Sequence, residues 1–141
     1  MYDIKPGENG KTDNEGCSWV EPLAHRQAYP AGTELFRQGS TPRSVYLIDR
    51  GVVKLIRSDG NDTIVSLAYP GCVLGDAATV LGKSHPTAAV TLTSCDLRCL
   101  PAVDFRRLIE EDATFSWQVH VAQSRELYKY TTDMFRRSSG A

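Results

Sequence analysis

Residues 45–67 read VYLIDRGVVKLIRSDGNDTIVSL, and they decide the fold class. Three short apolar runs are separated by turn residues: 49–51 end the first run, and 58–62 separate the second from the third. Gly60 lies in the second turn and provides the positive φ that a tight hairpin needs. Short apolar runs separated by such turns are typical of antiparallel strands. This stretch therefore predicts a β-hairpin inside an all-β domain.

The same texture extends in both directions from this hairpin. Apolar runs, glycines and turn residues recur about every eight to twelve positions between Tyr29 and Leu100. We predict an all-β unit at about 28–100. Residues 1–18 are rich in Gly, Asp, Asn, Glu and Lys, and we expect them to form a mobile tail before a single domain at 19–141.

The pattern becomes helical after Pro101. The apolar spacing of Phe105, Leu108 and Ile109 predicts a helix at about 102–111. Asp112 is a suitable N-cap for a second helix at about 113–137, a stretch that contains no glycine or proline.

This second helix has two apolar faces. One is a heptad seam, for which we expect a homodimer; its members are Trp117, Val121, Ser124, Tyr128, Thr131 and Phe135. The other is expected to pack on the barrel; its members are Phe115, Val119, Ala122, Leu127, Tyr130 and Met134. The alternative is one broad stripe buried within a single domain.

Charge and composition limit the partners. The 141 residues carry a formal net charge of -1, so no global basic field attracts nucleic acid, and we expect DNA contact only through a domain absent from this chain. No apolar run approaches the ~20 residues of a membrane span, and the N-terminus has no apolar signal core, so we expect a cytoplasmic protein. Four cysteines, at 17, 72, 95 and 99, form no CxxC pair and are expected to be reduced core thiols.

The glycine and turn spacing resembles one known family throughout. The matching landmarks are Pro30-Ala31-Gly32, Leu35-Phe36, Gly39, Val45–Ile48, Gly51, Gly60, Gly71 and Leu74-Gly75-Asp76. This order is similar to the cyclic-nucleotide-binding domain of Crp/Fnr-type transcription regulators, from about Ala28 to Met134. The resemblance implies a mainly β jelly roll (a double-stranded β-helix, RmlC-like) followed by C-terminal helices, the last a long dimerisation helix.

In that family, a short helix after a Gly-Glu pair binds a phosphate with its backbone N–H groups, and an arginine pairs with the phosphate. The resemblance places this cassette at Leu74, Gly75, Asp76, Ala77 and Ala78, with Thr87 and Ala88 beside it. Asp76 replaces the glutamate that holds the ribose, and Pro86 stands where the arginine is expected. The effector is therefore expected to be a small molecule other than cyclic AMP.

The cassette loop and the long helix contain further polar candidates. Lys83 and His85 lie in the cassette loop and can partly replace the missing cation, although we expect the ring of His85 to face water. His120 is expected to be solvated. By resemblance, the base-contacting positions of the long helix fall on Tyr130 and Thr131; the alternatives are barrel packing for Tyr130 and a polar heptad position for Thr131.

The stretch 85–87 and the Leu100-Pro101 join resemble the Fnr branch, whose iron–sulfur cluster needs four cysteines, three of them close together near the N-terminus. Only Cys17 lies in that region, so we expect no cluster, and a lone histidine is no indication of haem. The three histidines are not paired at close spacing, and no nucleophile–base pair is present at motif spacing, so no metal site and no catalytic residue are predicted.

Two functions remain in competition. The first is an effector-sensing domain of a transcription regulator, without its helix-turn-helix domain, and either excised from a longer protein or complete as it stands. The second is a ligand-free barrel that serves as a dimerisation or docking platform. A polar pocket around Gly75, Asp76 and Thr87 would favour the first; a pocket filled by Leu74, Val80, Leu81 or the Trp19 region would favour the second. An enzyme is not expected.

Overall fold

The computed structural model describes the backbone of residues 23–139 and the side chains of residues 23–134. Within this part of the chain, a run of strands comes first and two helices come last, with one short helix between strands. The elements are β1 (His25–Tyr29), β2 (Glu34–Phe36), β3 (Ser44–Arg50), β4 (Val53–Ser58), β5 (Asp62–Ala68), β6 (Val73–Leu74), α1 (Asp76–Leu81), β7 (Ala88–Thr91), β8 (Cys95–Pro101), α2 (Ala102–Glu111) and α3 (Ala113–Ser139).

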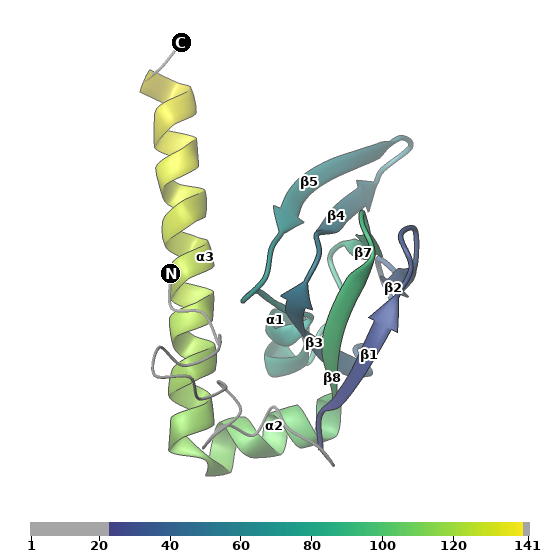
Figure 1. Ribbon diagram of the computed structural model, residues 1–141. Helices are drawn as coiled ribbons and strands as arrows, with labels where there is room; N and C mark the ends of the chain where they lie inside the picture. The colour runs from purple at the N-terminus through teal and green to yellow at the C-terminus, as the bar shows by residue number, and fades with distance from the viewer. Residues whose placement is uncertain (1–22, 140–141) are drawn as a thin grey trace.

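The strands form two four-stranded antiparallel sheets, in the orders β1-β8-β3-β6 and β2-β7-β4-β5. The sheets curl around each other into a barrel, with the β4–β5 hairpin extending from one end (Figure 1). Strands that are neighbours in space are often distant in sequence, such as β3 and β8, which is the connectivity of a jelly roll. The predicted fold class, a β jelly roll followed by helices, is confirmed.

The inner core of the barrel is filled from both sheets. Alternate residues of a strand point to opposite faces, so Cys95 and Leu97 of β8 face inward while Leu100 belongs to the outer face. The inner cluster contains Ile48, Val53, Ala68, Cys72, Leu74, Ala89, Cys95 and Leu97. Both faces of β8 are therefore buried, and Cys72 and Cys95 are core thiols as expected, while Cys99 is only half-buried.

A second core joins the first sheet to the helices. Phe105 of α2 and Phe115 of α3 are fully buried and meet edge to face, with ring centroids 5.6 Å apart. They pack with Val45, Leu47 and other residues of the outer sheet face. The sharp α2–α3 join is stabilised by a carboxylate oxygen of Asp112, which accepts a hydrogen bond from the backbone N–H of Phe115 at 3.0 Å, as the sequence predicted.

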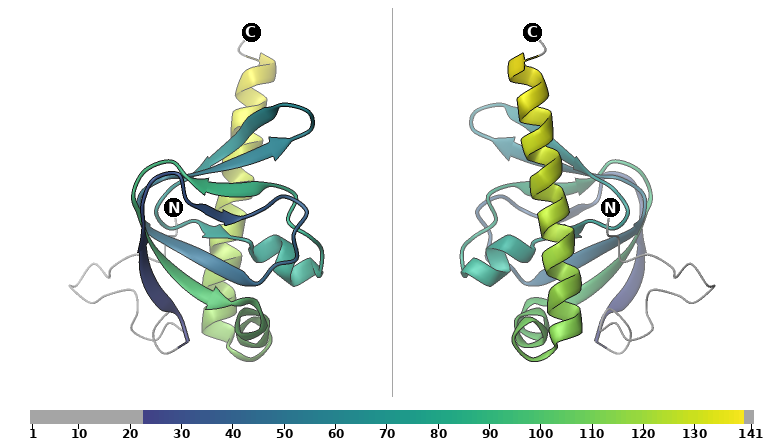
Figure 2. Two further views of the ribbon diagram at one scale, coloured as in Figure 1. Left: turned by 90° about the vertical axis from the view of Figure 1, so that its right-hand side faces the viewer. Right: turned by 90° about the vertical axis from the view of Figure 1, so that its left-hand side faces the viewer.

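Helix α3 runs along one side of the barrel but packs on it only in its first half (Figures 1 and 2). Phe115, Val119 and Ala122 are buried, as predicted. The rest of that face is exposed: Leu127 to 66% and Tyr130 to 63%. The expectation that the whole face packs on the barrel is therefore wrong, because the helix is anchored at the α2 join and a hollow separates its second half from β5.

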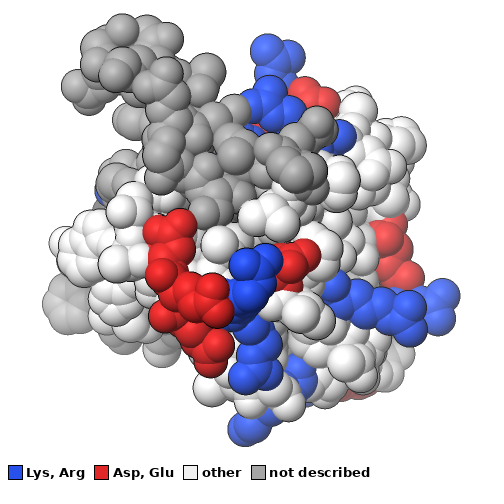
Figure 3. All heavy atoms as spheres, turned by 90° about the horizontal axis from the view of Figure 1, so that it is seen from below, with Lys and Arg blue, Asp and Glu red and all other residues white. Residues whose placement is uncertain are grey.

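The hydropathy of the helices and the charge of the surface can be compared with what a membrane span or a nucleic-acid surface would need. No helix in the described part of the chain has an apolar stretch long enough to cross a bilayer. On the face seen from below, acidic and basic side chains of the described residues lie side by side and form no continuous basic surface (Figure 3). The expected tail at 1–18, with Cys17 and Trp19, and the side chain of Phe135 lie outside the described residues.

A candidate effector cassette between β6, α1 and β7

The cassette begins with a turn that only glycine fits well. Gly75 joins β6 to α1 at φ 83°, and a Cβ added there would lie 3.1 Å from the backbone oxygen of Ser44 and 3.3 Å from Cε1 of His85. The hydroxyl of Thr79 donates to the carbonyl of Gly75 at 2.8 Å and closes the turn from the other side. The backbone at Gly75 is thus surrounded closely, which fixes the start of α1.

Asp76 is the first residue of α1, and it is tied to the long helix. The side-chain amide of Gln123 donates to Oδ2 of Asp76 at 2.7 Å. Burial of the carboxyl group raises the pKa of Asp76, and the hydrogen bond from Gln123 offsets part of that rise. The backbone N–H groups of Asp76 and Ala77 also donate to this carboxylate, and an incoming hydroxyl or N–H group would compete with Gln123 for it.

His85 is buried, so the expectation that its ring faces water is wrong. Its side chain is stacked on the ring of Phe36, with centroids 3.8 Å apart, and only 2% of the residue is exposed. Two backbone hydrogen bonds hold this loop: the N–H of His85 donates to the carbonyl of Ser40, and the N–H of Gly39 donates to the carbonyl of His85. They turn the ring inward against the Gly75 turn, and desolvation there lowers the pKa of His85. A buried neutral imidazole is a poor substitute for an arginine.

Thr87 and Ala88 follow on the same loop and are half-buried. Ala88 starts β7 and pairs with Ile56 of β4. Beside them, Nη1 of Arg57 donates to the carbonyl of Pro86 at 3.0 Å. Neither Arg57 nor Gln123 was among the residues predicted from the sequence to lie at this site. The inward alternation of β4 could have indicated Arg57, whereas no signal in the sequence distinguishes Gln123 from other polar residues of α3.

The cyclic nucleotide-binding domain family matches this chain over residues 26–112. The chain belongs to this family. A cyclic AMP receptor protein from Thermus thermophilus is 29% identical over 86 residues, which cover 60% of this chain and 40% of that protein. A cAMP-dependent protein kinase regulatory subunit from Eremothecium gossypii is 26% identical over 99 residues, or 70% of this chain and 21% of that protein. The chain thus spans less than half the length of both curated relatives.

Solved structures show the same fold. The catabolite activator protein of Thermus thermophilus superimposes with a TM-score of 0.65 at 24% identity, over 82% of this chain and 55% of that chain. The regulator CLP of Xanthomonas campestris, whose structure is described as c-di-GMP responsive, gives a TM-score of 0.66 at 20% identity, over 81% and 59%. This cyclic nucleotide-binding domain therefore resembles those of Crp-type regulators.

The residues expected at the ligand site differ in burial and in whether they come together. Leu74 is buried in the inner core and Ala78 is buried on α1, whereas Ala77 is exposed at the surface of α1. Tyr130 and Thr131 are exposed on α3, where the hydrogen bond to α1 comes instead from Gln123, about two turns earlier. The segment from Gly75 to Ala78 and the loop at 85–88 do come together, since His85 lies against Gly75.

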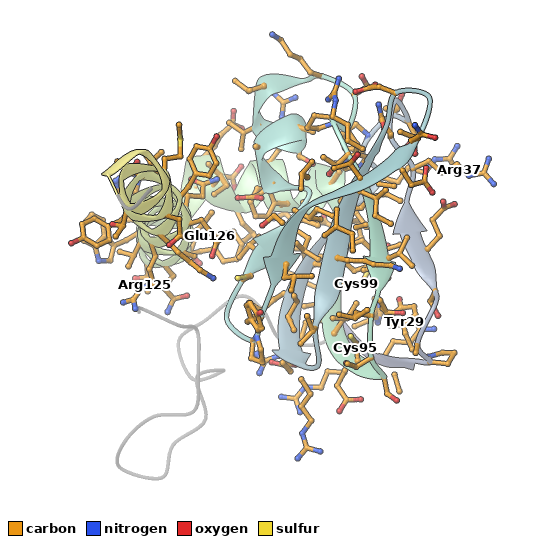
Figure 4. All side chains as sticks on the ribbon, turned by 90° about the horizontal axis from the view of Figure 1, so that it is seen from above. Tyr29, Arg37, Cys95, Cys99, Arg125 and Glu126 are labelled. Atoms are coloured by element: carbon orange, nitrogen blue, oxygen red, sulfur yellow. The ribbon has the colours of Figure 1, made fainter. Side chains whose placement is uncertain are left out.

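A groove of about 580 Å³ separates β5 from the second half of α3 in this domain. Two residues that line it, Glu126 and Lys129, also contact the barrel from the side of α3 where Figure 4 shows Glu126. Sγ of Cys72 donates to Oε2 of Glu126 at 3.2 Å, and Nζ of Lys129 lies 4.9 Å from the ring centre of Tyr69. Burial and the neighbouring Glu126 raise the pKa of Cys72 to about 12, so the thiol stays protonated. Tyr130 lines this groove, so it faces β5 without being packed against it.

Proposed function

We propose that this chain is the effector-sensing and dimerisation domain of a Crp/Fnr-type transcription regulator, that it works in the cytoplasm, and that it is not an enzyme. The contact between the cassette and the long helix supports this proposal most: Asp76 at the start of α1 is hydrogen-bonded to Gln123 of α3. A ligand that hydrogen-bonds to Asp76 displaces Gln123 and so changes how α3 packs on the barrel. This is a two-state element that a small molecule can bias.

We propose further that the effector is a small anion other than cyclic AMP, as in an Fnr-like regulator. Pro86 stands where the resemblance expects the phosphate-binding arginine, and His85 beside it is buried and stacked. Asp76 is one methylene shorter than the expected glutamate. A lost charge-assisted hydrogen bond weakens binding by roughly 1.5–3 kcal/mol, or about one to two decades in affinity.

The second candidate is a platform that binds no ligand. The polar groups of the cassette already have partners within the chain, Asp76 in Gln123 and His85 in Phe36, which favours this reading. Leu74 is buried in the inner core, which also fits a filled site. Against the platform, Val80 and Leu81 are exposed to 45% and 67% and so do not fill the site. We place the sensor first for this reason.

A thermal-shift screen separates the two candidates. The ligands are cyclic AMP, cyclic GMP, 2-oxoglutarate, pyrophosphate and cyclic di-GMP, each from micromolar to millimolar concentration. A true effector at one hundred times its Kd stabilises the fold by ~2.7 kcal/mol, which raises Tm by several degrees. We expect no shift with millimolar cyclic AMP and a shift with at least one other anion. A clear shift at submillimolar cyclic AMP rejects the assignment of the effector, and no shift with any ligand favours the platform.

The dimer is proposed through the side of α3 that faces away from the barrel. On that side, the structure leaves Trp117 exposed to 63% and Tyr128 to 76%. Ser124 and Thr131 are exposed there too, and Val121 is half-buried. Exposed large aromatic side chains on one helix face are typical of an interface. We assign any DNA contact to a separate domain.

A further inference from the structure

Arg57 lies near the hairpin end of β4 and contacts the cassette loop at Pro86. In the pairing of β4 with β7, Leu55 is opposite Ala89 and Ile56 is opposite Ala88, so the next position places Arg57 beside Thr87. Leu55 packs against the inner core. Because side chains alternate along a strand, Arg57 projects from the same, inward face of the sheet as Leu55.

The guanidinium of Arg57 is fixed against the loop at 85–88. Nη1 donates to the carbonyl of Pro86 at 3.0 Å, and Nε donates to Oδ2 of Asp59 at 2.9 Å. A guanidinium has five N–H donors, so three remain for another acceptor. Fork-shaped donors of this kind recognise carboxylates and phosphates with two parallel hydrogen bonds.

A purely structural role in the hairpin does not explain this position well. The side chains of Arg57 and Asp59 are 47% and 64% exposed, and ion pairs this open to water add little to stability. The other cation candidates of the loop serve less well, because His85 is buried against Phe36 and Lys83 is exposed after α1.

We propose that Arg57 supplies the cation that binds the anionic group of the effector, a carboxylate or a phosphate, in place of the arginine absent at residue 86. This inference rests on the proposed sensor function. In the ligand-free state Asp59 occupies Nε of Arg57, and the anion of the effector competes with it. Asp59 therefore lowers the affinity of the site and keeps weakly binding anions out.

Titration calorimetry on the whole chain tests this with 2-oxoglutarate as the dicarboxylate, pyrophosphate as the phosphate and adenosine as the uncharged probe. Arg57→Gln is expected to weaken the binding of whichever anion binds by ten- to a hundredfold, and Arg57→Lys to restore part of it. Asp59→Asn is expected to strengthen the same binding severalfold, a gain that misfolding cannot imitate. Arg50→Gln removes a more exposed arginine, at the end of β3 and paired only loosely with Asp96 at 3.9 Å, and should change nothing.

Each result bears on the proposal. Loss with Arg57→Gln together with gain in Asp59→Asn supports it, and the preferred anion tells a carboxylate effector from a phosphate one. If an anion binds Arg57→Gln as tightly as it binds the wild-type chain, or if only adenosine binds, the role of Arg57 is wrong and the sensor function stands. If no probe binds the wild-type chain, the sensor function is wrong and the role of Arg57 falls with it.

Discussion

Gly75 forms the turn at the start of the cassette. Replacing it with any other residue is expected to lower the stability of the fold for two reasons. The first is the positive φ of 83°, which costs an L-residue roughly 1–2 kcal/mol. The second is the approach to Ser44 and His85, both within 3.3 Å of an added Cβ. At Gly60, with φ 101°, only the cost of the positive φ applies, because nothing lies within 4 Å of an added Cβ there.

Comparison of the two alanine variants therefore isolates the close approach. Gly60→Ala is expected to lower the free energy of unfolding by about 1 kcal/mol, and Gly75→Ala by about 2–3 kcal/mol, since overpacking adds to the strain. Urea unfolding followed by circular dichroism measures both. Equal losses in the two variants would show that the surroundings of Gly75 yield freely.

His85 predicts the pH dependence of stability. Burial lowers its pKa in the fold below the unfolded value of 6.5, so between these two values the unfolded chain holds a proton that the folded chain lacks. The free energy of unfolding is therefore expected to fall as the pH drops below 6.5, and to level off below the folded pKa. His85→Phe, which keeps a ring on Phe36, should flatten this dependence, and replacement of the exposed His25 by Gln should leave it in place. The carboxyl group of Asp76 acts in the opposite direction at pH values just above its ordinary pKa of 3.8, because burial raises its pKa in the fold.

At the scale of the element, α3 combines an anchored half and a free half. Phe115 is fully buried among residues of α2 and the outer sheet face, and its truncation to alanine is expected to cost about 3–5 kcal/mol. Leu127 belongs to the same predicted face but is 66% exposed, so Leu127→Ala should stay within about 0.5 kcal/mol. Chemical denaturation measures both values. A large loss for Leu127→Ala would mean that α3 closes onto β5 in solution.

The elements that were predictable from sequence were those with a local cause. Gly51, Gly60 and Gly75 all adopt positive φ at strand or helix boundaries, so the spacing of turn residues was sufficient to predict an all-β unit, and the family resemblance supplied the jelly roll. The two helices followed from apolar spacing and from the cap at Asp112. The partial packing of α3 was not predictable, because a period of apolar residues specifies a face but not whether a partner reaches it.

The site was predictable at its backbone but not in its side chains. The Gly75 turn and the loop at 85–88 meet as the family resemblance implied. The burial of His85 depends on the backbone of Ser40 and Gly39, which are distant in sequence, and so does not follow from the polar composition of its own loop. Arg57 reaches the loop only through the pairing of β4 with β7, which is likewise a tertiary property.

At the scale of the whole molecule, the exposed side of α3 predicts association. Tyr128 is 76% exposed, and burying such a side chain stabilises an interface by about 1.5–3 kcal/mol, while a carboxylate in its place would face its own copy across a twofold seam. Tyr128→Glu is therefore expected to weaken association at least tenfold, since each 1.4 kcal/mol is a factor of ten.

Sedimentation equilibrium over a range of concentrations measures this, with Leu92→Glu as the matched control. Leu92 is 44% exposed, lies between β7 and β8 away from α3, and should not affect the dimer. Emission of Trp117, exposed to 63% in the single chain, should shift to the blue as the wild-type protein associates. A wild-type chain that stays monomeric at high concentration, or a dimer unaffected by Tyr128→Glu, would show that this face of α3 is not a homodimer interface. Because α3 is anchored to the barrel only in its first half, its outer face and the groove beside β5 would then remain as the surfaces for a different partner.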